Sequence, residues 1–529
     1  MNAERLLLHY EQIADAPDAI ARLRRFILDL AVRGKLVPQD PADEPASALT
    51  TPIDNLSTDD TALPQGWCRA KVGSILDFQY GKGLKATERL QSGPVPVFGS
   101  NGVVGYTDEP LTTRPSVIVG RKGSAGALNL CYGPSWTTDV AYFIEVPEAF
   151  DIRFLFCSLA SLSLDKLGKG VKPGLSRSDA YEQTVDIPSL AEQHRICAKF
   201  DELMALCDAL EAERTEREMK RDRLAAASLA RLNAPDPETF HNDARFVLDA
   251  LPALTARPGQ IKQLRQTILN LAVRGKLVPQ DPADEPAEEL LRQILEVRNG
   301  ITRSSKKISI EDAIVQSDNS LSGWVSATVQ DVAEVGTGST PTSTDSSYYS
   351  NGHIPWLTSS ASGLDEIISA DNFVTEKALR EFRLKIYPPG SLLVALYGQG
   401  KTRGQVAKLS LSATVNQACA VITWIAGFED LEKFMLLIFR QQYHEMRLKA
   451  EGGAQPNLNL RKIKELKIPL PPLAEQRRIV AKVDDLMALC DQLEASLTSA
   501  DETRKKLLDA LLAEALAPVE TFKIQEAAE

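Results

Sequence analysis

The chain has 529 residues, of which 43% are hydrophobic and 25% are charged, and its formal net charge is −11. This length exceeds one ordinary hydrophobic core, so about three or four domains of a soluble globular protein are expected. No apolar run approaches the roughly 18–20 residues that span a bilayer, and the charged N-terminus is unlike a signal peptide. These features argue against membrane and secreted classes, and we expect a cytoplasmic protein.

Metal and redox chemistry are not indicated by the residue types. Seven cysteines include no CxxC pair and five histidines are scattered, which predicts reduced thiols and no metal site. The acidic charge is unevenly spread: residues 64–187 hold 13 Lys/Arg against 12 Asp/Glu, and residues 321–469 hold 15 against 14. The rest of the chain therefore carries −13, and the two nearly neutral segments are free to present local basic patches.

The first predicted element is a helix near the N-terminus. Ile20, Leu23, Ile27 and Leu30 recur at spacings of three and four, which places them on one apolar stripe. Gly34 suits the left-handed residue after a helix, and prolines then hold the chain extended. The segment LAVRGKLVPQDPADEPA (30–46) recurs letter for letter at 271–287, and the longer segment 23–46 matches 264–287 at 21 of 24 positions.

A second segment is also repeated: residues 190–212 match 473–495 at 18 of 23 positions. Ser189 and Glu192 predict a capping box at the start of a helix, although Pro472 replaces the serine in the second copy. A helix of about 40 residues would be about 60 Å long, and its narrow apolar seam predicts a partner helix, most simply its own repeat. The predicted seam consists of Ile196, Phe200, Leu203, Leu206, Leu210, Ile479, Val483, Leu486, Leu489 and Leu493.

Between these repeats lie two segments that alternate β-branched and aromatic residues with glycine turns, a pattern typical of strands and loops. The two segments share little sequence, whereas the offset between the flanking repeats grows from 241 to 283 residues. Two copies of one surface favour two copies of one partner, and two different middles favour two different targets. On DNA this would be a bipartite site at a spacing set by the protein. A recent duplication that has not yet drifted is the alternative.

Several motifs carry a family resemblance. VPVFGSNGVVGY (95–106) and VIVGRKGSAG (117–126) in the first middle, and GSTPTSTDSSYYSNGHIPWLTSS (338–360) in the second, resemble target-recognition domains of Type I restriction–modification specificity (S) subunits. The junctions KGVKPGLSRSDAYEQTVDIPSLAEQHRI (169–196) and GGAQPNLNLRKIKELKIPLPPLAEQRRI (452–479) resemble the boundary between a recognition domain and a conserved helix in that family. The resemblance covers nearly the whole chain, twice.

The resemblance implies a non-catalytic subunit that reads an asymmetric, two-part site in double-stranded DNA. Two methyltransferase (M) subunits would dock on its two halves, and restriction (R) subunits with motor activity would bind the assembly. S-adenosylmethionine, ATP and Mg²⁺ would be bound by those partners and not by this chain. The sequence agrees, because it contains no Asn-Pro-Pro-Tyr-type methyltransferase motif and no group of carboxylates beside a lysine.

The expected architecture is α+β, with two α/β target-recognition domains separated by long antiparallel helices that form a coiled-coil spacer. The duplication predicts a pseudo-two-fold arrangement. The expected boundaries are an N-terminal helical segment (1–62), a first recognition domain (63–188), a central conserved region (189–305), a second recognition domain (306–469) and a C-terminal helix (470–529).

The candidate DNA contacts are side chains in glycine-rich loops. Lysine and arginine can bind phosphates, and amide and phenol groups can bind base edges; a solvated loop is the alternative for each residue. In the first middle they are Lys82, Lys85, Asn101, Arg121, Lys122, Lys169, Lys172 and Arg177. In the second they are Tyr397, Gln399, Lys401, Arg403, Gln405, Asn416, Gln417, Asn457 and Arg461, with Lys462 beside the last.

Other functions remain to be weighed. ALYGQGKT (395–402) resembles the end of a phosphate-binding loop, but Ala395 stands where that motif needs glycine and the following RGQVAKLSLSATV predicts a strand, so an ATPase is disfavoured. The recognition subunit of a methyltransferase-only or other phage-defence system is an alternative in the same class. A coiled-coil scaffold that does not bind DNA is an alternative in a different class.

Overall fold

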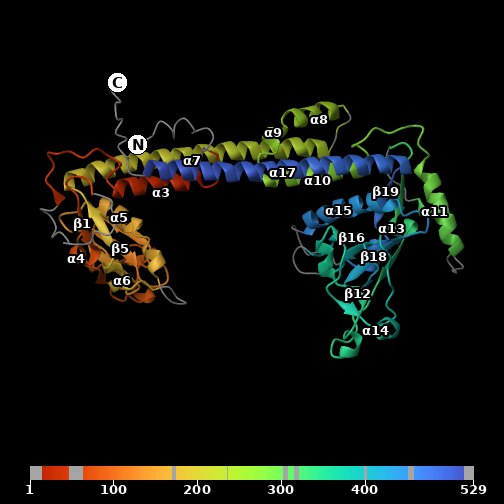
Figure 1. Cartoon of the computed structure of the whole chain (residues 1–529), viewed down its shortest axis with the longest axis horizontal. Helices are drawn as coiled ribbons and strands as arrows, with labels where there is room; N and C mark the ends of the chain where they lie inside the picture. Colours follow the sequence, from red (N-terminus) through yellow and green to blue (C-terminus); the bar gives the residue numbers. More distant parts are fainter. Residues whose placement is uncertain are drawn as a thin grey trace, which may run out of the picture. The chain divides into compact units, whose positions relative to one another are not determined.

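A computed structural model describes residues 15–46, 63–168, 174–234, 236, 238–301, 308–314, 321–397, 402–450 and 458–516 (Figure 1). The chain divides into two compact units, Met1–Glu218 with Ala500–Glu529, and Met219–Ser499. Each unit joins one mixed α/β domain to a set of frame helices. We call residues 63–188 the first middle domain and residues 306–469 the second middle domain.

The first middle domain is built on a four-stranded antiparallel sheet with the order β2-β8-β5-β6. Every residue of its central strand, SVIVG, is buried, because helix α5 covers one face and a three-stranded sheet, β4-β3-β7, covers the other. Its elements are β1 (Cys68–Lys71), α4 (Val72–Ile75), β2 (Gln79–Tyr80), η2 (Ala86–Glu88), β3 (Val95–Gly99), β4 (Gly102–Thr107), β5 (Ser116–Gly120), β6 (Leu128–Cys131), β7 (Trp136–Thr137), β8 (Ala141–Glu145), α5 (Ile152–Ser161), η3 (Leu164–Leu167), α6 (Arg177–Tyr181) and β9 (Thr184–Ile187).

The second middle domain repeats this topology. Its sheets have the orders β11-β18-β15-β16-β13, β14-β12-β17 and β10-β19, and the last pair corresponds to β1-β9 of the first domain. Its elements, after α12 (Ile310–Ala313), are β10 (Val325–Thr328), α13 (Val329–Val332), β11 (Ala333–Thr337), η4 (Ser346–Tyr348), β12 (Ile354–Leu357), η5 (Ser359–Gly363), β13 (Glu366–Ile367), β14 (Phe373–Val374), α14 (Glu376–Glu381), β15 (Leu392–Ala395), β16 (Val406–Leu409), β17 (Thr414–Val415), β18 (Cys419–Trp424), α15 (Leu431–Ala450), α16 (Leu460–Lys464) and β19 (Lys467–Leu470).

In the first unit, helix α3 (Ala19–Val32) lies against the beginning of α7 (Leu190–Asn233) and the end of α17 (Leu473–Leu516). Arg24 on α3 pairs with Asp208 and Glu211 on α7, at 2.6 and 2.7 Å. Lys35, just after α3, donates to the carbonyl of Leu516 on α17 at 2.5 Å. These contacts make α3 antiparallel to α7 and parallel to α17, so the two long helices run antiparallel here.

The second unit repeats these contacts, with α17 in the place that α7 has in the first unit. Helix α10 (Pro258–Val273) carries Arg265, which pairs with Asp491 and Glu494 on α17, both at 2.7 Å. The end of α7 packs on α8 (Phe240–Asp249) and α9 (Leu251–Leu254), and α11 (Ala287–Ile301) joins the core of the second middle domain. Each long helix has 44 residues, as the sequence predicted.

The identical seventeen-residue segment clamps the start of each long helix. Asp43 accepts two hydrogen bonds from Arg195, at 3.2 and 2.7 Å, and one from Ser189 at 3.0 Å. In the second copy Arg478 donates to Asp284 at 3.2 and 2.5 Å. These hydrogen bonds hold the pKa of both aspartates below its ordinary value. The repeated segment therefore makes the same contact with an arginine of the long helix in both copies.

A buried carboxylate lies beside each clamp. Trp67 Nε1 donates to Glu192 at 3.1 Å, and Trp324 Nε1 donates to Glu475 at 3.0 Å. Burial raises the pKa of both glutamates, because it disfavours the charged form. The serine half of the predicted capping box is confirmed, since the amide of Glu192 donates to Ser189 Oγ at 3.0 Å, whereas the Glu192 carboxylate accepts from Trp67 and Gln39.

The predicted helical seam is correct only in part. Ile196 and Phe200 pack into the core of the first middle domain, not onto the other long helix. Leu206 and Leu489 are 54% and 53% exposed, and their neighbours Cys207 and Cys490 are buried instead. The helical repeat explains this, because a residue four positions after Leu203 turns closer to the buried face than one three positions after it.

All seven cysteines lie among the described residues and are buried free thiols. Burial raises the pKa of Cys157 and Cys419 to about 12, which keeps both protonated at neutral pH. No helix in the described part of the chain is long and apolar enough to cross a membrane.

Candidate nucleic-acid interface

Loops from distant parts of the first middle domain meet at one edge of its sheet. Lys122 forms a bridge with Gly174, and the amide of Leu175 donates to the carbonyl of Arg121 at 2.9 Å. The hydroxyl of Tyr142 donates to the carbonyl of Leu175 at 3.1 Å. The turn after β5 is therefore tied to the start of α6, and the structure brings together Arg121, Lys122 and Arg177.

Aromatic rings organise the cations at this edge. The guanidinium carbons of Arg121 and Arg177 lie 5.0 and 5.1 Å from the ring centre of Tyr80, which is 51% exposed. Lys82 lies over Trp136, with its Nζ 5.8 Å from the ring centre. Cation–π contacts of this kind hold long side chains in place while leaving N–H groups available.

Two further predicted residues, Asn101 and Lys85, are exposed in neighbouring loops. Asn101 is exposed in the turn between β3 and β4, and that turn touches the one after β5: a Cβ added to Gly120 would meet the carbonyl oxygen of Ser100 at 2.4 Å. Only glycine allows this approach. Lys85 is exposed at the start of η2.

At the matching edge of the second middle domain the structure places neutral polar groups. Asn416 accepts from the amide of Ala418 at 3.0 Å, which fixes the turn between β17 and β18. Gln417 accepts from the hydroxyl of Thr340 at 2.5 Å, and Tyr397 follows β15 with 49% of its surface exposed. These side chains present hydroxyl and amide groups, which can pair with base edges.

The remaining predicted residues of the second domain are less close to a common edge. Arg461 pairs with Glu465 at 2.7 Å on α16, which raises the pKa of Arg461, and Lys462 lies beside it. Arg403 and Gln405 lie before β16 and are half-buried. Lys169, Lys172, Gln399, Lys401 and Asn457 lie outside the described residues. The strand β16, and not a helix, follows ALYGQGKT, which agrees with the prediction against a phosphate-binding loop.

Strand register shows that the two edges are built alike but carry different chemistry. Tyr80 pairs with Tyr142 on β8, and the corresponding pair on β11 and β18 is Thr337 with Ala420. Gly81 and Gly338 follow at the same place, and a Cβ on either would meet a backbone oxygen at 2.1 or 1.6 Å. The first edge is thus cationic and aromatic, whereas Thr340, Asn416 and Gln417 at the second edge, all among the described residues, carry neutral polar side chains.

Sequence reasoning missed Tyr80, Trp136 and Thr340. Tyr80 and Trp136 lie on strands of two residues each, which give no periodic signal. The glycines that follow Tyr80 and precede Thr340 were a usable signal, because an extended strand that ends in glycine suggests close backbone approach.

A second surface appears twice, once in each unit. It is the outer face of each long helix near its start, and its residues fall within about 100° around the helix axis. They are identical in the two copies and exposed in both: Ala191, Ala198, Ala205 and Leu206, matched by Ala474, Ala481, Ala488 and Leu489. We call these the duplicated face. The same arc also holds Arg195 and Glu202, matched by Arg478 and Asp485, so the face is mixed; its repeated, exposed leucine makes it a candidate protein contact.

Differences between the two long-helix copies occur where their neighbours differ. Cys197 and Phe200 are replaced by Val480 and Val483, and all four belong to or pack against the cores of the two middle domains. His194 lies 3.6 Å from Asp151, whereas its counterpart Arg477 pairs with an aspartate of the second domain. Drift has therefore occurred in these helices, and the duplicated face has stayed the same.

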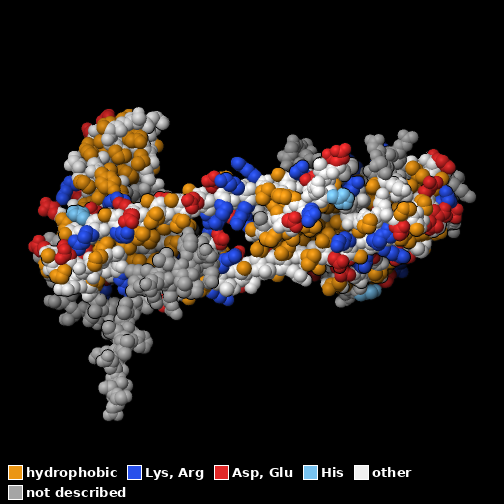
Figure 2. All heavy atoms as spheres, turned by 90° about the horizontal axis from the view of Figure 1, so that it is seen from above, with side chains coloured by type: hydrophobic (Ala, Val, Ile, Leu, Met, Phe, Trp, Pro, Cys, Tyr) orange, Lys and Arg blue, Asp and Glu red, His pale blue; other side chains and the backbone are white. Residues whose placement is uncertain are grey.

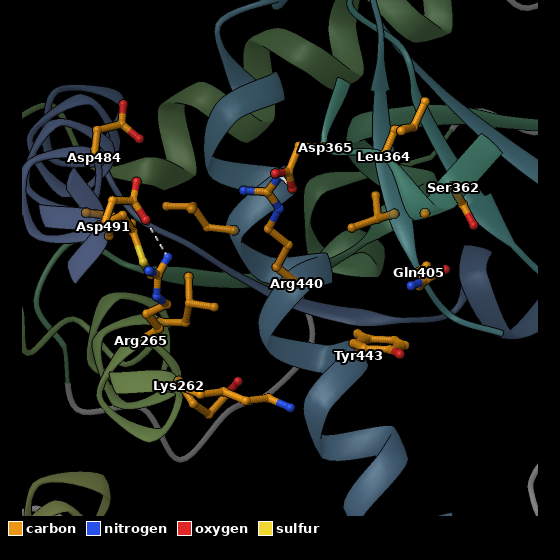
Figure 3. A pocket seen from close by; sticks show the side chains of 17 residues that line it. Lys262, Arg265, Ser362, Leu364, Asp365, Gln405, Arg440, Tyr443, Asp484 and Asp491 are labelled. Carbon is orange, nitrogen blue, oxygen red and sulfur yellow. Dashed lines mark hydrogen bonds and ion pairs between the residues drawn. The ribbon is translucent and has the colours of Figure 1, made fainter. Parts of the chain in front are cut away.

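A cavity of about 490 Å³ lies within the second unit, between the middle domain and the frame (Figure 3). Its charged groups neutralise one another: Arg440 pairs with Asp365 and Arg265 with Asp491, each at 2.7 Å. On the face drawn in Figure 2, Lys and Arg side chains likewise lie among Asp and Glu side chains. We assign no chemistry to this cavity.

The domain pattern matches one family. The model of the Type I restriction modification DNA specificity domain matches residues 64–219 and 321–500, which together cover most of both middle domains and the start of each long helix. The chain belongs to this family. It is a specificity subunit, the recognition component of a Type I restriction–modification system and not a catalytic one.

Relatives span the same length. The chain is 24% identical to the EcoAI specificity subunit of Escherichia coli over 574 residues, covering 93% of each protein. It is 24% identical to the EcoEI specificity subunit of the same species over 571 residues, covering 94% of each. Among solved structures, the HsdS subunit from Thermoanaerobacter tengcongensis is 18% identical with a TM-score of 0.42, and the alignment covers 86% of this chain and 98% of that one.

Proposed function

We propose that this specificity subunit reads a two-part, asymmetric site in double-stranded DNA, one half-site with each middle domain. The observation that carries the proposal is that one topology occurs twice with different side chains at the same edge. Tyr80, Arg121 and Arg177 lie at the first edge, and Thr340 and Gln417 at the second. A scaffold that only spaced two identical partners would not require this difference.

The side chains at the two edges favour different kinds of DNA contact. Arginine and lysine at the first edge favour phosphates and guanine, whereas amide and hydroxyl groups at the second favour adenine and other base edges. The half-sites therefore differ, and the complete target is asymmetric.

The duplicated face would dock two copies of one partner, one methyltransferase subunit on each long helix. Support comes from the exposed leucines: Leu206 and Leu489 occupy the same position and have nearly equal exposure, 54% and 53%. An exposed leucine kept in both copies, while nearby buried residues differ, indicates a shared external contact. Restriction subunits would bind the resulting assembly.

Cofactor chemistry would belong to those partners. S-adenosylmethionine would be bound by the methyltransferase subunits, and ATP with Mg²⁺ by the restriction subunits. Because its target is DNA inside the cell, the complex would work in the cytoplasm. A methyltransferase-only system would use the same recognition chain without restriction subunits.

Selection from a random pool of duplexes tests the proposal. The chain, purified with its co-expressed methyltransferase subunits, is incubated with the pool, and retained DNA is sequenced over several rounds. We expect enrichment of one motif with two unlike specified parts and an unspecified gap. Enrichment of a single continuous motif, or none, would contradict reading by two domains.

A further inference from the structure

We propose that Tyr80 is a positioning residue that holds Arg121 and Arg177 as a two-pronged clamp for the DNA phosphate backbone at the first half-site. This inference rests on the proposed function and deepens it. It assigns a role to a residue with no charge and no predicted contact of its own.

The geometry brings two like charges onto one ring. Arg121 and Arg177 come from the turn after β5 and the start of α6, yet their guanidinium carbons lie 5.0 and 5.1 Å from the centre of the Tyr80 ring. The two carbons are therefore at most about 10 Å apart. Each arginine also contacts a second ring, Arg121 that of Tyr142 at 5.8 Å and Arg177 that of Tyr181 at 5.7 Å.

Neither guanidinium is neutralised within the described part of the domain. Arg121 donates to the backbone carbonyl of Asp139 at 3.0 Å, and neither arginine takes part in an ion pair there. Other arginines of this unit are paired, such as Arg69 with Asp186 and Arg153 with Asp201. Two adjacent, unneutralised cations repel each other, and this arrangement is favourable once an anion lies against both.

The ring determines which atoms are free to bind. A guanidinium held over a ring by a cation–π contact keeps N–H groups that the ring does not bind, and these can pair with the oxygens of a phosphate. Tyr80 is held in turn by its edge-on contact with Tyr142, whose ring centre is 5.1 Å away, and Tyr142 is buried. The clamp is thus anchored to the core before DNA arrives.

Two described positions of the second domain that correspond to Tyr80 and Arg121 carry other side chains. Thr337 takes the place of Tyr80, and Leu396 follows β15 where Arg121 follows β5. Among the described residues, these two positions of the second domain therefore supply neither the ring nor the cation that the clamp uses in the first domain.

Salt dependence of DNA affinity distinguishes this role from others. Each phosphate contact adds about 0.9 to the slope of log affinity against log salt, so each lost contact reduces the affinity change between about 50 and 200 mM salt by roughly 3- to 4-fold. Arg121→Gln and Arg177→Gln should each lower the slope by about 1. Tyr80→Leu, which changes no charge, should lower it by between about 1 and 2. Tyr80→Phe keeps the ring and should retain the wild-type slope.

The measurement uses fluorescence anisotropy with the full chain bound to its methyltransferase subunits and a duplex of arbitrary sequence. Tyr132→Leu is the matched control, because Tyr132 lies in the same domain, is 62% exposed and contacts no cation among the described residues. If Tyr80→Leu and Tyr132→Leu give the same slope of log affinity against log salt, Tyr80 does not position Arg121 and Arg177 on phosphate and the proposal is wrong. If Tyr80→Leu keeps the slope but weakens only the selected target, Tyr80 serves base reading and the phosphate assignment is wrong. Failure of the wild-type complex to bind DNA at all would overturn the proposed function itself.

Discussion

Truncation of the exposed leucine on each long helix should weaken capture of the methyltransferase subunit. Complete burial of a leucine side chain contributes about 1.5–3 kcal/mol. Leu206 and Leu489 are each about half exposed, so a partner can bury only the remaining half. Each Leu→Ala substitution should therefore cost about 1 kcal/mol of docking free energy, or about fivefold in the dissociation constant.

Mass photometry of the co-expressed assembly during dilution measures this loss. The wild-type chain should retain two methyltransferase subunits, and each single variant should release one of them at about fivefold higher concentration. The double variant should release both. Leu224→Ala is the control, because Leu224 lies on the same helix, is 41% exposed and is outside the repeated segments. Equal retention by Leu206→Ala, Leu489→Ala and Leu224→Ala would refute the docking role of the duplicated face.

Three further predictions concern the frame. Gly34→Ala should lower the free energy of unfolding by more than about 1 kcal/mol, because φ is +65° and the new Cβ would lie 2.7 Å from a carbon of Pro64. Gly66→Ala is the control: φ is +81° and no atom of the described residues lies near the new Cβ, so it should cost only the backbone strain, and equal losses in chemical denaturation would contradict the steric contact at Gly34. The buried Glu192 and Glu475 have raised pKa values, so their protonated forms stabilise the fold below the ordinary pKa of 4.5, and this stabilisation is lost as pH rises through the raised values. Between pH 4 and 8 the melting temperature of the double Glu→Gln variant should therefore fall less than that of the wild type. The same change in melting temperature for both proteins would contradict this prediction. Asn270→Asp should cost about 1–3 kcal/mol, since it removes a 2.8 Å hydrogen bond to the end of α7, and a melting temperature at or above that of the wild type would contradict it.

The frame could be predicted because its signals are local. Gly34 and Ser189 each determine a turn or a helix start locally, and the structure shows a left-handed glycine and a serine N-cap there. The clamp between Asp43 and Arg195 could not be predicted, because it joins residues that are far apart in the sequence. Only the exact repetition of the segment indicated that something specific was being conserved between the copies.

The strands were recognisable but their order was not. The sequence SVIVG predicts a buried strand. Its pairing with β8 and β6 depends on contacts between distant residues, which no local sequence pattern indicates. Both middle domains have the same pairing of these strands, although their residues differ. Their common topology was therefore hidden at the level of sequence, although the glycines Gly81 and Gly338 mark one equivalent position.

The candidate interface was predictable in residue type more than in arrangement. Glycine-rich loops led to the prediction of Arg121, Lys122 and Arg177 as DNA contacts, and the structure brings these three residues together. Tyr80 was overlooked, because an uncharged ring gains its role only through the cations stacked on it. Leu206 was assigned to the buried seam from the spacing of the apolar residues, whereas the structure buries Cys207 and leaves Leu206 exposed.

The central claim is that the two middle domains specify two unlike half-sites of one target. A genome-wide map of methylated bases in the source cell, with and without this gene, tests it most directly. The account predicts that deletion removes methylation from one asymmetric, two-part motif and that the intact gene restores it. An unchanged map, or loss of a continuous or palindromic motif, would contradict it.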